Sequence, residues 1–380
     1  MPCMEKTLNK TNIDAAMTER GLTQTALAET LGVSREAVSQ WLKNKSFPRP
    51  DKLLRLGKLL SLSFNELVEV NDQHAPVVTF RKMKGTKTTA DHIKKAQEMG
   101  LFLKPLVNFL PYEILEVPPV LKSPSCDYEY LQQVAQKVRS DIHVGESDKI
   151  DFTHLIRRFG ELQTVIIPVL WGSKVKHQNA THIYLPDSQT TWVYLNLDTN
   201  IHDFKFWMAH ELGHCLSPSL KGNDAEDFAD AFAGALLFPQ TLAKFAYVSV
   251  ASKQSDIEKV KAIVNIANEH VISPYTVFLQ INKYAESRGQ QPFIFESLLH
   301  SQITNFNKKF PLMSKALLGG DNAGEINPKE YLAKAAEAFD TAFFEILKKY
   351  LHESKKGFGY VQSVMDIPLL DAQSIYAELT

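Results

Sequence analysis

The chain has 380 residues and a mass of 42.9 kDa; 44% of the residues are apolar and 22% are charged. This length suffices for two or three domains, and the composition excludes a wholly disordered chain. The 42 basic and 43 acidic residues give a net charge of −1. That balance excludes a protein that coats nucleic acid along its whole length, so nucleic-acid binding is expected only locally.

The sequence shows no sign of a membrane partner or of export. No apolar run reaches the ~18–20 residues that cross a bilayer, and the first residues lack an apolar signal core. The cysteines, Cys3, Cys126 and Cys215, are far apart and odd in number. They predict a reducing, cytoplasmic compartment without a disulfide framework.

Residues 1–70 are predicted to form a run of short helices. Thr23 precedes a first helix that Gly32 ends, and Ser34 precedes a second helix directly afterwards. Serine and threonine cap helix N-termini, and glycine readily takes the left-handed conformation that ends a helix. This pattern is typical of a helix–turn–helix, in which the second helix enters the major groove of DNA.

Polar side chains on the two helices suit DNA contacts. Ser39 and Gln40 are suited to base edges and Arg35 to guanine or phosphate. Thr23 and Gln24 are suited to phosphate, which the backbone donors of a helix N-terminus also bind. A plain helical bundle for protein docking, with the basic residues as a solvated face, remains the alternative. The predicted DNA-binding set is Thr23, Gln24, Ser34, Arg35, Ser39, Gln40 and Lys43.

The same segment resembles the XRE/Cro/CI helix–turn–helix family over residues 8–70, including the stretch SREAVSQWLKNKSFP. The resemblance implies an all-α, five-helix domain that binds operator DNA, usually as a homodimer.

The middle of the chain changes character. Residues 71–127, rich in proline, are predicted to be a linker or adaptor, and a helix begins near residue 128. Strands in one stretch followed by helices favour an α+β domain within a largely helical chain. The apolar strands are predicted at 164–171, 181–185 and 191–197, and the next helices at 202–216 and about 224–237. The last of these strands suits either substrate binding by edge pairing or a place in the core.

The sequence His210-Glu211-Leu212-Gly213-His214 is the strongest chemical signal. Residues four apart share one face of a helix, so both imidazoles can bind one metal ion with Glu211 beside them. A catalytic zinc ion needs a third protein ligand and an open position for water. Cys215 follows on a different helix face, where we expect packing rather than a redox role.

The next predicted helix supplies the third ligand. Glu226 lies twelve residues after His214, far enough for a short loop and one helical turn. Asp230 lies one turn further on the same face and is suited to orienting a histidine. Asn223 followed by Glu226 also resembles a capping pair, so a capping role for Glu226 stays open.

This ligand set predicts a peptidase mechanism. Two neutral histidines and a carboxylate leave Zn²⁺ one position for water, whose pKa falls towards neutral. Glu211 then takes a proton from that water and hands it to the leaving amine. A second donor to the oxyanion is expected but is not singled out among His154, His177, His182, His202, Tyr184 and Tyr194.

The stretches AHELGHCL and AEDFADAFAGALLFP look like those of the ImmA/IrrE family of zinc metallopeptidases. The similarity extends less sharply over 128–285, and an XRE domain ahead of the peptidase is an arrangement of that family. The resemblance implies zinc ligands at His210, His214 and Glu226, with Glu211 as general base. It also implies that the substrate is a helix–turn–helix repressor, whose cleavage releases stress-response, mobile-element or defence genes.

The predicted order is therefore a DNA-binding domain at 1–70, a linker or adaptor at 71–127, a zincin-like peptidase domain at 128–285 and a helical region of unknown role at 286–380. Residues 328–353 are predicted to be one amphipathic helix for core or dimer packing, with a sensor or substrate-docking site as the alternative. The predicted function is a cytoplasmic zinc endopeptidase, with its own DNA-binding domain, that cleaves a repressor. The alternatives are a non-catalytic DNA-binding regulator that uses the peptidase fold as a sensor or protein-binding module, and an antitoxin; self-cleavage is a further prospect.

Overall fold

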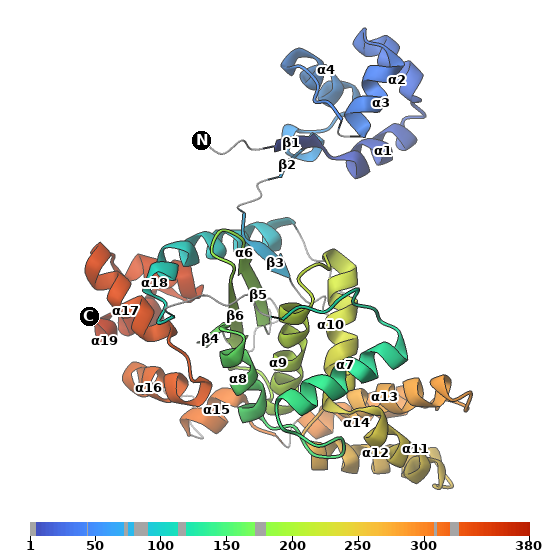
Figure 1. Ribbon diagram of the computed structural model, residues 1–380, viewed down its shortest axis with the longest axis vertical. Coiled ribbons are helices and arrows are strands. Elements are labelled where there is room, and N and C mark those ends of the chain that lie inside the picture. The colour runs from blue at the N-terminus through green and yellow to red at the C-terminus, as the bar shows by residue number, and fades with distance from the viewer. Residues whose placement is uncertain are drawn as a thin grey trace. The chain divides into compact units, whose positions relative to one another are not determined.

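A computed structural model of the chain describes residues 5–43, 45–71, 75–79, 90–112, 119–171, 180–307, 310–319 and 327–380. The chain divides into two compact units, residues 1–75 and 76–380, and each has its own hydrophobic core. The first unit is mainly helical, and the second combines many helices with a four-stranded sheet (Figure 1). The mixed α+β class predicted from the sequence is confirmed at this level.

The first unit packs its helices around one apolar core that includes Ile13, Leu27, Val38 and Trp41. Its helices are α1 (Lys10–Glu19), α2 (Gln24–Leu31), α3 (Arg35–Leu42), α4 (Pro50–Leu60) and α5 (Phe64–Leu67). The prediction of an all-α unit needs one correction. Strands β1 (Glu5–Leu8) and β2 (Val68–Asn71) pair antiparallel at its two ends.

The sheet of the second unit has the order β3-β5-β6-β4. Its strands are β3 (Val77–Thr79), β4 (Val165–Val169), β5 (Ala180–Leu185) and β6 (Thr190–Asn196). Neighbours pair antiparallel except β4 with β6, which are parallel. Because β6 pairs on both sides, it has no free edge for a substrate strand. The structure therefore favours the core interpretation of residues 191–197 over edge pairing.

Helices cover both faces of this sheet. One face packs against α6 (Ala90–Leu103) and α18 (Phe358–Met365); the Tyr194 hydroxyl donates to the Val364 carbonyl at 2.7 Å. The other face packs against α9 (Ile201–Leu216), which lies beside α8 (Phe152–Glu161) and α10 (Gly222–Leu237). The HELGH sequence thus lies on a helix directly against the sheet.

The remaining helices build outward from this centre. They are the 3-10 helix η1 (Lys104–Phe109), α7 (Tyr128–Asp141), α11 (Gln240–Ala251), α12 (Asp256–His270), α13 (Pro274–Ser287), α14 (Glu296–Asn307), α15 (Met313–Leu318), α16 (Pro328–Phe339), α17 (Phe343–Ser354) and α19 (Leu369–Leu379). Helix α7 packs on α10, whereas α16 and α17 pack against the edge strand β4. Within the described ranges no single helix is long and apolar enough to span a membrane; α10 and α11 meet that test only as a pair bent by 72°.

Two sequence predictions change in this unit. Of the predicted linker or adaptor at 71–127, Asn71 belongs to β2 of the first unit. The described parts of 76–127 pack within the second unit and are not a linker, because β3 pairs with β5 and both Leu103 and Leu106 are buried in its core. Residues 72–74, 80–89 and 113–118 lie outside the description. The predicted single helix at 328–353 is two helices, because Asp340 adopts φ +44° and ends α16.

Candidate functional site: a helix–turn–helix and a candidate metal centre

The helix–turn–helix of the first unit is built from two side-chain caps and one glycine. The Thr23 hydroxyl accepts from the Ala26 amide at 3.2 Å and begins α2, and the Ser34 hydroxyl accepts from the Ala37 amide at 3.1 Å and begins α3. Gly32 between them has φ +64°, a conformation that glycine adopts without strain. The turn predicted from sequence is therefore present with its predicted caps.

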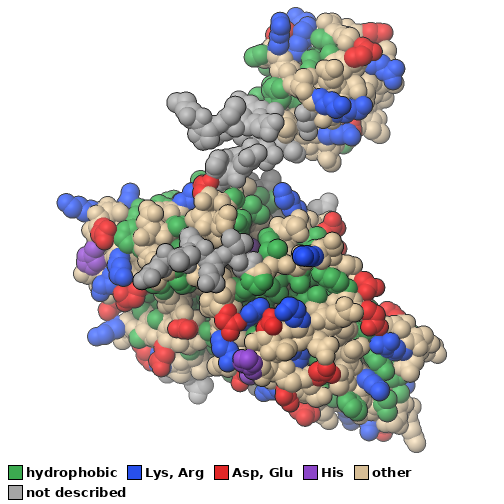
Figure 2. Space-filling model, in the orientation of Figure 1, with side chains coloured by type: hydrophobic (Ala, Val, Ile, Leu, Met, Phe, Trp, Pro, Cys, Tyr) green, Lys and Arg blue, Asp and Glu red, His purple; other side chains and the backbone are tan. Residues whose placement is uncertain are grey.

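The polar side chains predicted to contact DNA gather on one side of this motif. A shallow depression is lined by Gln24, Arg35, Glu36, Ser39 and Gln40. Arg35 and Gln40 are exposed, and Lys43 is exposed at the C-terminal end of α3. Lys and Arg side chains lie at several places on the surface of this unit (Figure 2).

Lys52, a basic residue of the same region, stabilises the turn between the two helices. The Lys52 ammonium group donates to the Leu31 carbonyl at 2.8 Å, at the end of α2. A cation at a helix C-terminus can donate to a free carbonyl group and interacts favourably with the helix dipole. We therefore assign Lys52 a structural role at this turn and do not include it among the residues that face DNA.

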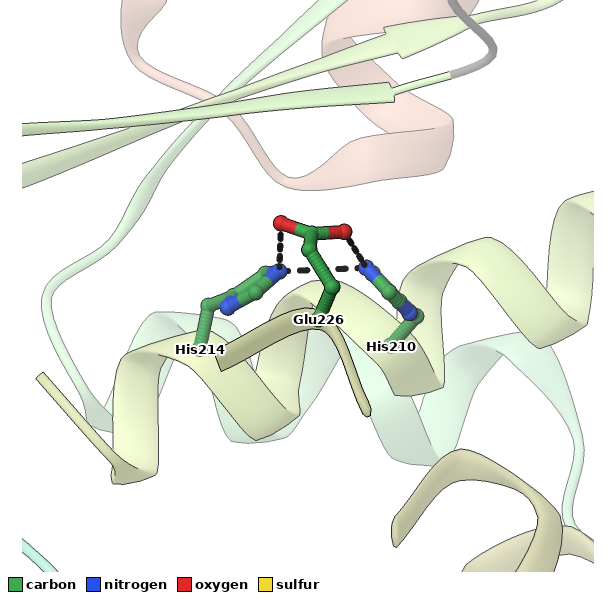
Figure 3. A group of neighbouring side chains, drawn as sticks. All are labelled: His210, His214 and Glu226. Carbon is green, nitrogen blue, oxygen red and sulfur yellow. Dashed lines mark hydrogen bonds and ion pairs between the residues drawn. The ribbon is translucent and has the colours of Figure 1, made fainter. Parts of the chain in front are cut away.

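In the second unit, α9 and α10 bring three donor groups together (Figure 3). His210 and His214 project from α9 with their Nε2 atoms 3.1 Å apart. The Glu226 carboxylate on α10 lies 3.5 Å from His210 Nε2 and 3.4 Å from His214 Nε2. All three side chains are buried, and the predicted triad is therefore one spatial cluster.

The cluster fits a zinc ion. Zinc bonds of about 2.0–2.2 Å in tetrahedral geometry place neighbouring donor atoms about 3.4 Å apart. The donor atoms here can be chosen within 4.8 Å of one another, and two imidazoles with one carboxylate leave one coordination position open. Helix α10 begins at Gly222 with Lys221 as its N-cap residue. Asn223 is therefore not the cap that the alternative interpretation of Glu226 required.

The neighbouring carboxyl groups occupy two different positions. Asp230 Oδ1 lies 2.9 Å from His210 Nδ1, which leaves the Nε2 atom of that ring facing Glu226. Glu211 is 2% exposed, and its Oε2 atom has no hydrogen-bond partner among the described residues. Asp230 thus contacts the ring nitrogen that points away from Glu226, while Glu211 keeps an oxygen available.

Electrostatics distinguishes the members of the cluster. Burial opposes the charged form of His210, yet the hydrogen bonds of Asp230 and Glu226 raise its pKa to about 9. Burial raises the pKa of Glu211 to about 8 although His210 opposes the shift. Burial, with His210 and His182 nearby, holds the pKa of His214 well below its usual value. Zinc binds the neutral imidazole, so metal binding would displace the proton that the raised pKa places on His210.

The close approach of α9 and α10 depends on Gly213. A β-carbon there would lie 3.1 Å from both the Ala229 α-carbon and the Phe232 ring. Next to it, burial raises the pKa of the Cys215 thiol to about 12, and its sulfur lies 3.8 Å from the Thr164 hydroxyl. A protonated, buried thiol agrees with the packing role predicted for Cys215.

The structure separates most candidates for the oxyanion donor from the cluster. Tyr194 faces α18, His202 contacts Asn307 at 2.9 Å, and His154 Nδ1 accepts from the Asp151 amide at 3.0 Å. His177 lies outside the described residues, and Tyr184 is half-buried on β5. Among the candidates that the structure describes, His182 is the one with a ring contact to the triad, 5.7 Å from His214 between ring centroids. Nothing in the sequence around His182 distinguished it from the other candidates.

Comparison with known proteins identifies the first unit only. Residues 13–67 match the family model described as helix-turn-helix, which supports a DNA-binding regulatory role. Neither the comparison with curated proteins nor the comparison with solved structures gives a match.

Proposed function

We propose that the second unit is a zinc-dependent endopeptidase of the kind that the ImmA/IrrE resemblance implies, joined to a DNA-binding regulatory domain. One observation carries the proposal: His210, His214 and Glu226 converge at distances of 3.1–3.5 Å, with the buried Glu211 next to His210 in the chain. A structural zinc site closes its fourth position with a protein ligand, whereas a catalytic site keeps that position open.

Each residue has a distinct task in this proposal. A bound Zn²⁺ would polarise a peptide carbonyl and lower the pKa of a water molecule. His210, His214 and Glu226 would hold that ion, and Asp230 fixes the His210 ring. Glu211 Oε2 accepts a proton from the water that attacks the peptide carbonyl. It then delivers this proton to the nitrogen of the breaking peptide bond, which leaves as an amine.

The proposed substrate is a regulatory protein in the cytoplasm, a helix–turn–helix repressor as the family resemblance implies. The N-terminal unit supports this context because it is itself a helix–turn–helix that matches its family over 13–67. Binding to an operator would place the peptidase near proteins that occupy the same DNA.

The test compares the wild type with Glu211→Gln. This substitution keeps the volume of the side chain and leaves the three ligands in place, so the purified variant should contain zinc as the wild type does. New protein N-termini are then compared in host cells that express each form, with and without DNA-damaging or phage stress. We expect a truncated regulator only with the wild type.

A second function is favoured by the family match itself, which supports DNA binding and leaves the activity of the second unit open. In that case the protein is a non-catalytic regulator with a sensor or protein-binding unit. Identical N-termini for both forms under every condition, with zinc bound, would favour this function over the peptidase.

A further inference from the structure

The sheet contributes a histidine to the space above the metal-binding group. A β-carbon on Gly100 of α6 would lie 3.1 Å from Ile183 Cγ2, so Ile183 faces α6. Neighbouring residues of a strand point to opposite faces of the sheet. His182 therefore faces α9, and its ring lies 5.7 Å from that of His214 between centroids.

This histidine is buried without a hydrogen-bond partner. It is 5% exposed, and neither Nδ1 nor Nε2 has a partner within the described part of the chain. Its cross-strand neighbour on β3 is Thr79, which faces the same side and also has a buried hydroxyl without a partner there. Because buried polar groups are almost always satisfied, these atoms are suited to receive a polar molecule beside the metal-binding group.

The position of His182 favours contact with substrate over contact with metal. Among the described residues, the group whose ligand atoms lie within 4.8 Å of one another contains His210, His214 and Glu226 and not His182. The histidine is thus adjacent to the donors but outside their set. An imidazole there has one N–H group to donate, and a peptide carbonyl is an acceptor.

We propose that His182 is a catalytic residue that donates a hydrogen bond to the carbonyl oxygen of the peptide bond to be cleaved. The assignment rests on the proposed peptidase function. It places the substrate carbonyl group beside His182 of β5 and Glu211 of α9. The two residues then have different tasks: His182 holds the carbonyl oxygen and Glu211 moves a proton.

The experiment uses the full chain loaded with zinc and acetohydroxamic acid, a small ligand that presents a carbonyl oxygen to a metal site. His182→Phe removes the donor, and His182→Gln restores an N–H group. The control, His202→Gln, changes a buried histidine at the start of α9 that contacts Asn307. Zinc content is measured first, and the Kd of acetohydroxamic acid is then measured by calorimetry.

We expect all four proteins to bind zinc equally. The Kd should rise about 10-fold or more in His182→Phe, as expected for the loss of one hydrogen bond to a charged or polarised group. His182→Gln should recover part of that loss, and His202→Gln should match the wild type. In the wild type, the His182 ring resonances, identified by their absence from His182→Gln, should shift when the ligand is added. This measurement decides the matter if the Phe variant does not fold.

Four results would overturn the proposal. An unchanged Kd in a folded His182→Phe, or ring resonances that do not move, would exclude the hydrogen bond. Loss of zinc from a folded His182→Phe would make His182 a metal ligand instead. A wild type that binds no zinc would refute the proposed function itself, and the assignment of His182 with it.

Discussion

Lys205 is a buried cation that the fold tolerates by hydrogen bonding. Its side chain on α9 is 1% exposed, and its ammonium group donates to the Ile150 carbonyl at 3.1 Å and the His270 carbonyl at 2.6 Å. Burial lowers its pKa to about 7, nearby Lys149 lowers it further, and Asp151 opposes the shift. The side chain of Lys205 thus links the segment before α8 to the end of α12 by hydrogen bonds, although burial disfavours its charged form.

This residue predicts a pH dependence of stability. Between pH 7 and about 10 the unfolded chain keeps a proton on Lys205 that the folded chain releases, so the free energy of unfolding should rise with pH. In Lys205→Met this contribution is absent. Denaturant unfolding of both proteins at pH 7, 8, 9 and 10 should show a smaller rise in the free energy of unfolding for the variant. Parallel curves would mean that Lys205 stays charged when folded.

The packing of α9 on α10 brings the three candidate ligands together. Gly213 lies at this contact and lets the two helices approach closely. In Gly213→Ala the new methyl group would press on the Ala229 backbone and the Phe232 ring, both in the buried core. Overpacking of this kind costs about 1–3 kcal/mol. We expect a lower free energy of unfolding and weaker zinc binding, because Glu226 would move away from the histidines.

Gly160→Ala is the matched control. Gly160 lies in α8, and a β-carbon there would meet nothing within 4 Å. Alanine should therefore leave zinc affinity unchanged and stabilise the helix by up to about 1 kcal/mol. The free energy of unfolding is measured by denaturant titration, and zinc affinity by competition with a chromogenic zinc chelator. Equal zinc affinity in the two variants would show that the spacing of α9 and α10 does not control the site.

The elements that carry a strong periodic or capping signal were predictable. The helix of His210, the two caps of the helix–turn–helix and the three apolar strands follow local rules that act within about ten residues. Strand β3 has three residues, and only its pairing with β5 makes it a strand. Asp340 breaks a helix by adopting a left-handed conformation that the surrounding apolar pattern does not reveal. Contacts between segments distant in sequence form strand β3 and bring His182 next to His214, and local rules do not predict such contacts.

At the scale of the whole molecule, the two units have separate hydrophobic cores. The proposed zinc ligands all belong to residues 76–380, and the helix–turn–helix belongs to residues 1–75. A ligand stabilises only the cooperative unit that binds it, by about 4 kcal/mol when its free concentration is about 1,000 times its Kd. Zinc and DNA should therefore act on different unfolding transitions.

Differential scanning calorimetry of the full chain tests this independence. We expect two transitions, of which a zinc chelator lowers only the one that belongs to the second unit. Duplex DNA selected by the wild type from a random-sequence pool should raise only the other. Gln40→Ala should weaken the effect of that DNA, since Gln40 is exposed on α3 and suited to a base edge. A single transition that both the chelator and the DNA shift would show that the two units unfold as one.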